Sequence, residues 1–193
     1  MMTNQEIWTI ALQQSAYDSG CLPEDFLKAE NVVTISQKHP QARKYLKLPL
    51  SCDLVSYGTN IVAQASEEIA PLVKQYIDRY PVEHCFETPS MHILNDAFQK
   101  EGFRVCFMAE YFLPDLDCLR ILECGYELRD LRQEDFSTLY KKEWSNALCE
   151  KRKHLDMLAV GAYDGETLIG LAGVSADCDT MYQIGIDVLP SYR

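Results

Sequence analysis

The chain has 193 residues, of which 47% are apolar and 24% are charged. This balance is typical of a globular protein and excludes an intrinsically disordered chain. The formal net charge of −11 at pH 7 opposes binding to nucleic acid and to anionic membrane surfaces, so a cationic amine suits this chain better as a ligand.

Eight cysteines are present, but they form no Cys-x-x-Cys pair and no histidine cluster accompanies them, so we expect no metal site. Cys85 and Cys106 lie in apolar runs that we interpret as strands, where a thiol acts as a small hydrophobic group. The first residues carry no basic cluster ahead of an apolar run, and no run is long enough to span a bilayer. These features predict a cytoplasmic protein.

Helix signals dominate the first part of the chain. Residues 3–6, Thr-Asn-Gln-Glu, match a capping box, which predicts a helix that ends at Gly20. Short packing helices are expected from Leu22 and through residues 39–46. Residues 54–63 have the composition of a hairpin that turns near glycine.

The next stretch alternates helix and strand signals. Ser66 is expected to cap an amphipathic helix whose apolar positions are Ile69, Leu72, Val73, Tyr76 and Ile77. Residues 84–87 are predicted as a short strand, residues 91–100 as a helix capped by Ser90 and ended by Gly102, and residues 103–113 as a long strand. Residues 114–124 then link the two halves of the chain.

The second half begins with a predicted strand at residues 126–131 and a helix from Gln133. The apolar stripe of that helix is made of Phe136, Leu139, Tyr140, Trp144, Ala147 and Leu148. Three alternating apolar runs follow, at residues 157–163, 167–175 and 181–188. The first two are joined by Asp164-Gly165-Glu166, and an Asp-Gly pair between such runs predicts a hairpin. The second turn contains Asp177 and Asp179, which we interpret as turn formers.

Four glycines fall inside this predicted meander: Gly161, Gly170, Gly173 and Gly185. Glycine weakens a strand unless it forms a bulge or allows another backbone or a ligand to approach closely. Both interpretations remain open from the sequence.

The order of these motifs resembles the GNAT superfamily of acyl-CoA-dependent N-acetyltransferases. The resemblance runs from about Gly125 to Arg193 and is strongest where an apolar residue is followed by x-Pro-x-Tyr-Arg, here Val188, Pro190, Tyr192 and Arg193. In the family this sequence leads into a glycine-rich loop that binds the pyrophosphate of acetyl-CoA. A looser likeness, Asn95 to Phe103, suggests a degenerate GNAT-like subdomain first, similar to the zwittermicin-resistance acetyltransferases.

The resemblance implies an α/β (α+β) fold with a mixed, mostly antiparallel sheet flanked by helices. It divides the chain into an N-terminal α/β subdomain at residues 1–124 and the first half of an acetyltransferase domain at residues 125–193. The implied activity is transfer of an acetyl group from acetyl-CoA to an amine of a small molecule or peptide, by direct attack.

Candidate site residues follow from the same resemblance. Ile186, Val188 and Arg193 are expected to bind the cofactor, because the fourth strand of the family pairs with the pantetheine arm. Asp187 and Glu143 are the candidate catalytic carboxylates, since amine transfer needs a proton acceptor. Trp144 and Asn146 are candidates for binding the acceptor.

Structural interpretations stand beside each catalytic one. Asp187 could instead serve the sheet, and Glu143 with its neighbours could be an exposed helix end. A non-catalytic GNAT-like interaction module and an incomplete form of a longer enzyme are the rival interpretations, because the sequence ends where the phosphate loop is expected. A homodimer is compatible with the sequence, and the acceptor amine is not specified by it.

Overall fold

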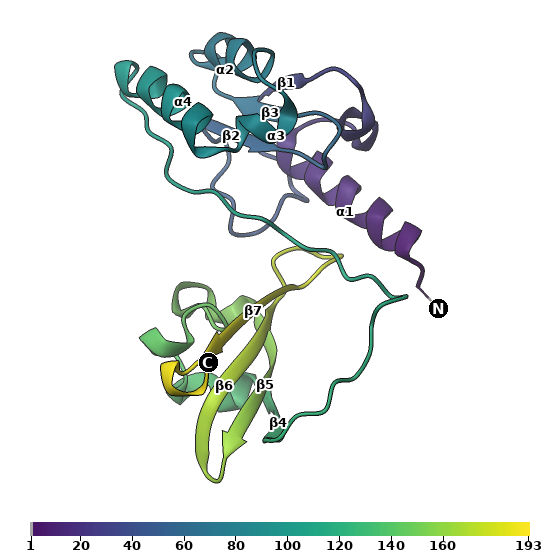
Figure 1. Cartoon of the computed structure of the whole chain (residues 1–193), viewed down its shortest axis with the longest axis vertical. Helices are drawn as coiled ribbons and strands as arrows, with labels where there is room; N and C mark the ends of the chain where they lie inside the picture. Colours follow the sequence, from purple (N-terminus) through teal and green to yellow (C-terminus); the bar gives the residue numbers. More distant parts are fainter. Residues whose placement is uncertain (1) are drawn as a thin grey trace. The chain divides into compact units, whose positions relative to one another are not determined.

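The computed structural model describes residues 2–193, which form two compact units divided between Leu116 and Asp117. Each unit contains a small sheet with helical segments packed on it (Figure 1). The α+β class with mostly antiparallel pairing, as predicted from the sequence, is confirmed. Among the described residues, no helix has both the length and the apolar character that a bilayer crossing requires.

The first unit is built on a three-stranded sheet in the order β1-β3-β2. β1 (Val32–Ile35) runs parallel to β3 (Val62–Ala65), and β2 (Cys52–Val55) runs antiparallel to it. β2 and β3 confirm the predicted hairpin, and Gly58 adopts a φ of 103° between them, which favours glycine. β1 has no counterpart among the predicted elements.

Helical segments cover both faces of this sheet. One face packs against α1 (Asn4–Ser19) and the 3-10 turn η1 (Pro23–Leu27), which contact Val62 through Leu12, Ala16 and Phe26. The other face packs against α2 (Ala70–Ile77), α3 (Val82–Cys85) and α4 (Thr88–Lys100). β3 is therefore buried along its whole length.

The strongest helix signals of the first unit are confirmed. Thr3 and Glu6 form the capping box of α1, and Gly20 ends that helix in the left-handed conformation. The five apolar positions expected for α2 pack into one core cluster. The expected cap at Ser66 is wrong, because the N-cap residue is Ile69 and no side chain caps the helix. α4 begins at Thr88, earlier than the sequence suggests, with Glu87 at the cap position.

Three predicted elements of this unit are wrong. Residues 84–87 do not form a strand, because α3 turns there and buries the Cys85 side chain in the core while Tyr76 Oη donates to the Cys85 carbonyl, 2.7 Å away. Residues 39–46 form turns rather than a helix. Residues 103–113 form no strand, since β propensity needs a neighbouring strand and these residues have none in the described chain.

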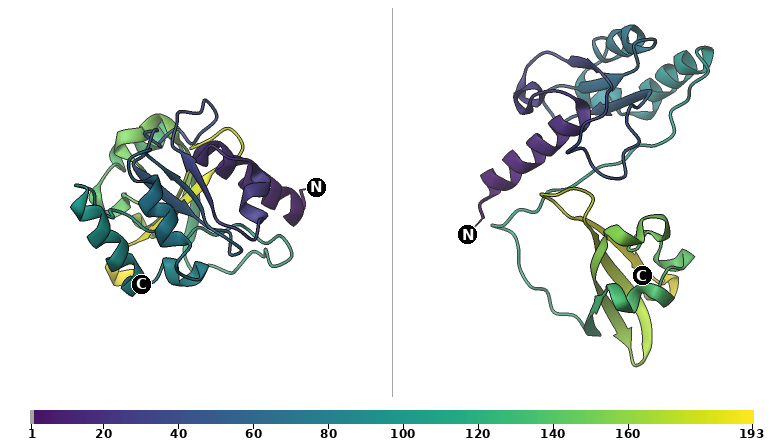
Figure 2. Two further views of the ribbon diagram at one scale, coloured as in Figure 1. Left: turned by 90° about the horizontal axis from the view of Figure 1, so that it is seen from above. Right: turned by 180° about the vertical axis from the view of Figure 1, so that it is seen from behind.

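The second unit contains a four-stranded antiparallel sheet in sequence order. Its strands are β4 (Glu127–Arg132), β5 (Asp156–Asp164), β6 (Thr167–Ser175) and β7 (Gln183–Val188). The predicted meander is thus confirmed, and Gly165 makes the first turn with a φ of 58°. Figure 2 shows the twisted sheet from two further directions.

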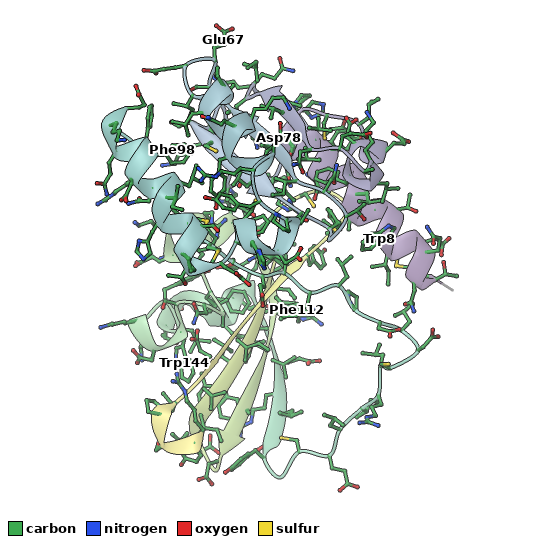
Figure 3. All side chains as sticks on the ribbon, turned by 45° about the horizontal axis from the view of Figure 1, so that its top comes forward. Trp8, Glu67, Asp78, Phe98, Phe112 and Trp144 are labelled. Atoms are coloured by element: carbon green, nitrogen blue, oxygen red, sulfur yellow. The ribbon has the colours of Figure 1, made fainter. Side chains whose placement is uncertain are left out.

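One face of this sheet is covered by 3-10 turns, not by the regular helix that the sequence suggests. The turns are η2 (Gln133–Thr138), η3 (Lys142–Trp144) and η4 (Glu150–Leu155). The predicted apolar stripe is nevertheless confirmed, because its residues pack on the sheet. The buried members of this cluster are Phe136, Trp144, Ala147, Leu148, Ala159 and Leu171, of which Trp144 is labelled in Figure 3.

Two glycines let the chain cross this face in direct contact with the strands. Gly173 of β6 lies opposite Gly185 of β7. A Cβ on either residue would overlap the backbone of Asn146 or Ala147, closer than real Cβ atoms come. Of the two interpretations open from the sequence, close approach holds at these positions, while a register shift between Ala162 and Tyr163 shows that the sheet also has an irregularity near Gly161.

Gly185→Ala is expected to lower the free energy of unfolding of the second unit by at least about 2 kcal/mol, because the added methyl group displaces the Asn146 carbonyl from the sheet. Denaturant unfolding followed by Trp144 fluorescence, in a Trp8→Phe background, measures this change. Gly170→Ala on β6 is the matched control, since its Cβ would meet its nearest neighbour at an ordinary 3.6 Å. Equal effects of the two substitutions would contradict the close approach.

Candidate functional site

Asp187 ties the segment at residues 146–147 to β7. Its carboxylate accepts hydrogen bonds from the Asn146 backbone N–H at 2.8 Å, the Asn146 side-chain amide at 2.8 Å and the Ala147 N–H at 2.9 Å. The side chain is 8% exposed, and it lies on the same face of the strand as Gly185. The structure therefore brings together two of the residues singled out from the sequence, Asp187 and Asn146.

These bonds define what Asp187 does in this conformation. Both carboxylate oxygens act as acceptors for fixed donors, so the residue positions the crossing segment. The sheet-supporting interpretation left open from the sequence describes this arrangement. The role of a general base stays a prediction.

The other two candidates from the same stretch lie on η3 and point to different surroundings. Trp144 is 4% exposed and packs in the apolar cluster of the second unit, where its ring supports the sheet face. Glu143 beside it is exposed. The structure does not bring the Trp144 ring to a surface where an acceptor could stack on it.

The outer edge of β7 carries two of the three predicted cofactor-binding residues, Ile186 and Val188, and Arg193 follows the turn η5 (Pro190–Tyr192). The Leu189 N–H donates to the Ile169 carbonyl at 2.9 Å, which fixes the alternation of the β6–β7 ladder. By that alternation, the backbone groups of Ile184, Ile186 and Val188 point away from β6. Arg193 Nε donates to the Val188 carbonyl at 3.0 Å, in agreement with this direction.

A small polar cavity of about 50 Å³ lies where the crossing segment meets the ends of β6 and β7. Its lining includes Asn146, Cys149, Arg152, Asp156, Ser175, Asp177, Gln183 and Gly185. A volume of this size holds one or two water molecules or the head of a small polar group. Within residues 2–193, no three side chains of the metal-binding types gather as a candidate ion site.

Two buried carboxylates and one guanidinium set the charge of this cavity. Asp156 is 1% exposed and Asp177 is 3% exposed. Arg152 Nη1 lies 3.6 Å from an Asp177 carboxylate oxygen, and Ser175 Oγ donates to the same oxygen at 2.8 Å. Arg152 Nε also donates to Cys149 Sγ at 3.4 Å. One cation facing two carboxylates leaves the cavity suited to a cationic or hydrogen-bond-donating group.

Asp156 has the most perturbed environment of the cavity. Burial raises the pKa of its carboxyl group, and hydrogen bonds from the Cys149 N–H at 3.0 Å and from Tyr140 Oη at 3.2 Å oppose that rise. Burial and the nearby Asp156 charge in turn raise the pKa of Tyr140 to about 12. Asp156 therefore holds a proton more readily than an exposed aspartate does.

Sequence reasoning missed this group of residues. Arg152, Asp156 and Asp177 come from η4, β5 and the loop after β6, and their proximity depends on the pairing of Asp156 with Ser175 across the sheet. Asp177 was assigned only to a turn. One signal was available: Asp156 is a charged residue placed directly at the start of an apolar strand, a position that usually requires partners.

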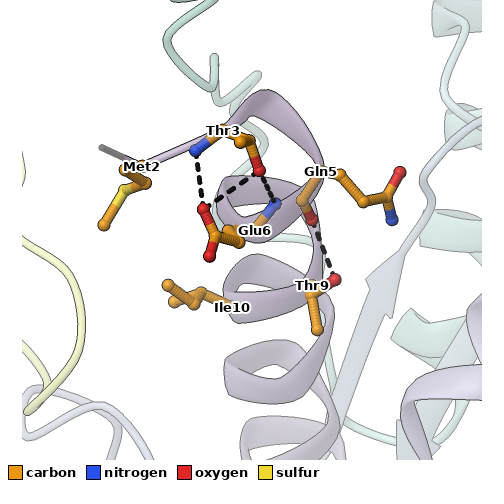
Figure 4. A pocket seen from close by; sticks show the side chains of 6 residues that line it. All are labelled: Met2, Thr3, Gln5, Glu6, Thr9 and Ile10. Atoms are coloured by element: carbon orange, nitrogen blue, oxygen red, sulfur yellow. Dashed lines mark hydrogen bonds between the residues drawn. The ribbon is translucent and has the colours of Figure 1, made fainter.

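A larger hollow lies against the start of α1 but offers no comparable chemistry. It measures about 660 Å³ and is lined by Met2, Thr3, Gln5, Glu6, Thr9 and Ile10 (Figure 4). All of these residues belong to one short stretch of the chain, and Thr3 and Glu6 are already engaged in the capping box. No groups from separate elements converge there, so it is not a candidate site.

Asp156→Asn is expected to change how stability depends on pH. Folding raises the pKa of Asp156, so the folded state binds more protons and wild-type stability falls as pH rises from the unfolded pKa to the folded pKa. Asparagine cannot ionise and keeps an acceptor for Tyr140, so the stability of the variant relative to wild type rises as pH increases from about 4, the ordinary pKa of an aspartate, through the raised pKa of Asp156. Thermal unfolding across this range measures the gain. Asp130→Asn, at an exposed position of β4, is the control, and identical pH profiles for wild type and Asp156→Asn would contradict the assignment.

Comparison with known proteins adds no assignment to this geometry: no protein-family model, curated protein or solved structure matches the chain.

Proposed function

We propose that this chain is an N-acyltransferase of GNAT type, which transfers an acetyl group from acetyl-CoA to a primary amine by direct attack. The observation that carries the proposal is the open outer edge of β7, with outward backbone groups at Ile184, Ile186 and Val188, next to a cavity with buried carboxylates. An extended amide-containing arm and a small amine could meet at this position.

The donor is proposed to bind as an added strand. The pantetheine arm of acetyl-CoA contains two amide groups, which can pair with the outward N–H and C=O groups of β7 as a peptide does in β-augmentation. Pairing at Val188 requires Arg193 to release the Val188 carbonyl. The N–H of Ile186 or Val188 would then donate to the thioester oxygen as negative charge develops on it.

The acceptor is proposed to enter the polar cavity as an amine. In the reaction, the amine nitrogen forms a bond to the thioester carbonyl carbon, the carbon–sulfur bond breaks with its electron pair leaving on the CoA thiolate, and the nitrogen gives one proton to a base of the protein. Asp156 is the proposed proton acceptor, because its environment favours the protonated form. Asp187 acts as a positioning residue, since it fixes Asn146 at the wall of the cavity.

Ile186→Pro is expected to weaken acetyl-CoA binding at least tenfold while leaving stability nearly unchanged. Proline removes an N–H that points away from β6, and an edge strand tolerates that loss. Titration calorimetry with acetyl-CoA measures the binding, and Ile186→Ala is the control because it keeps the N–H. Equal binding by both variants would contradict the added-strand mode. Absence of binding by wild type would favour the non-catalytic interaction module.

Asp156→Asn and Asp187→Asn separate the two proposed roles. Loss of the proton acceptor is expected to lower the rate of amine acetylation about 100-fold and to remove the acid limb of the pH–rate profile. Asp187→Asn keeps one oxygen that accepts from the Asn146 and Ala147 backbone N–H groups, and its amide can donate to the Asn146 side-chain oxygen once that side chain rotates, so its profile should retain the wild-type shape. Steady-state acetylation of a panel of small amines between about pH 5 and pH 9 measures both effects. A changed profile only for Asp187→Asn would reverse the assignment.

A further inference from the structure

Residues 103–115 carry a row of large exposed apolar side chains outside any sheet. Phe107 is 74% exposed, Met108 59%, Tyr111 64% and Phe112 87%. The segment forms neither helix nor strand, and Figure 1 shows the chain after α4 as an irregular coil. Phe112 is labelled within this segment in Figure 3. Its composition nevertheless predicts a strand, so the unpaired backbone points to a missing neighbour.

The first unit holds this segment at both ends. The Val105 N–H donates to the Asn95 side-chain oxygen at 3.0 Å, and the Leu116 N–H donates to the Asn4 side-chain oxygen at 2.8 Å. Because Val105 turns its N–H toward Asn95, the alternation of an extended chain directs the N–H groups of Arg104 and Cys106 to the opposite edge. That edge is the one available to a partner strand.

The charge pattern of the segment is complementary to itself. Between Phe103 and Leu113 the only charged residues are Arg104 and Glu110. An antiparallel pair of two copies, related by a two-fold axis at Phe107, places Arg104 of each copy opposite Glu110 of the other. The same register sets Phe103 opposite Tyr111 and Val105 opposite Ala109. Phe103 and Val105 are half-buried against the core of their own unit, so the apolar face of the pair continues that core and the exposed Phe107 lies at its centre.

The net charge of the protein makes this segment the most favourable place for two copies to meet. Copies with a net charge of −11 repel each other, and a neutral apolar segment is where that repulsion is weakest. Its exposed Phe107, Met108 and Tyr111 side chains are apolar surface that a second copy can bury.

We propose that residues 103–111 form the dimer interface of this protein, as a two-fold antiparallel strand pair between two copies. In this register the backbone groups of Arg104, Cys106, Met108 and Glu110 supply the ladder hydrogen bonds. Phe107 packs against its symmetry mate on the apolar face, and the two Arg104–Glu110 pairs fix the register. The inference is independent of the proposed enzymatic activity.

Sedimentation velocity of the full chain under reducing conditions tests the interface. Wild type is expected to dimerise in the micromolar range. Arg104→Glu and Glu110→Arg should each weaken dimerisation at least about tenfold, because each places like charges opposite one another twice per dimer. The double variant Arg104→Glu/Glu110→Arg should restore the dimer to within about threefold of wild type. Asp96→Arg, on the exposed side of α4, is the control for the change in net charge.

Sedimentation overturns the proposal if wild type is a monomer throughout the concentration range, if the single variants dimerise like wild type, if the double variant fails to recover, or if the assemblies are larger than a dimer. Amide hydrogen exchange completes the test. Protection of residues 104–110 that rises with protein concentration supports the interface. Protection in a monomer would assign the segment to a different occupant and would also overturn it.

Discussion

The second unit depends on one contact, the seating of the Asn146–Ala147 backbone on the glycine pair of β6 and β7. Gly173 and Gly185 have no side chains, so the backbone of residues 146–147 can lie directly on the sheet. Asp187, two residues along β7, then accepts both backbone N–H groups of the crossing segment. Each part requires the other, because a buried carboxylate without donors and a buried backbone without acceptors are both costly.

This contact also creates the polar cavity. Since the segment passes over the ends of β6 and β7, it brings Asn146 and Cys149 against Ser175 and Gln183. The cavity then encloses Asp156, whose oxygen is shared by the Cys149 N–H and the Tyr140 hydroxyl. A site with an unusual proton affinity thus arises from a packing requirement of the sheet, and the same residue, Asp187, serves stability and site geometry together.

Sequence reasoning found the elements with strong local signals and missed those that depend on distant partners. The α1 capping box, the α2 stripe and the Asp-Gly turn are encoded within a few residues, so each was predicted from the sequence. The crossing segment was predicted as a helix because its apolar spacing is helical, yet its path is set by β7, far along the chain. For the same reason the sequence predicts only some of the residues of the candidate site. Asp187 and Asn146 were selected, whereas Asp156 gains its character from Tyr140 and Arg152, which no local pattern links to it.

The outer edge of β7 and the segment at residues 103–111 both present backbone groups that no strand pairs, but they differ in their surroundings. The β7 edge stands beside buried carboxylates and an exposed guanidinium, so an occupant must carry polar chemistry as well as amide groups. Residues 103–111 lack such groups apart from one opposite-charge pair, so an occupant must be apolar and must repeat that pair in reverse. A cofactor arm satisfies the first condition, and another copy of the segment satisfies the second. Because the edges belong to different units, dimerisation through residues 103–111 leaves the backbone groups of β7 unused.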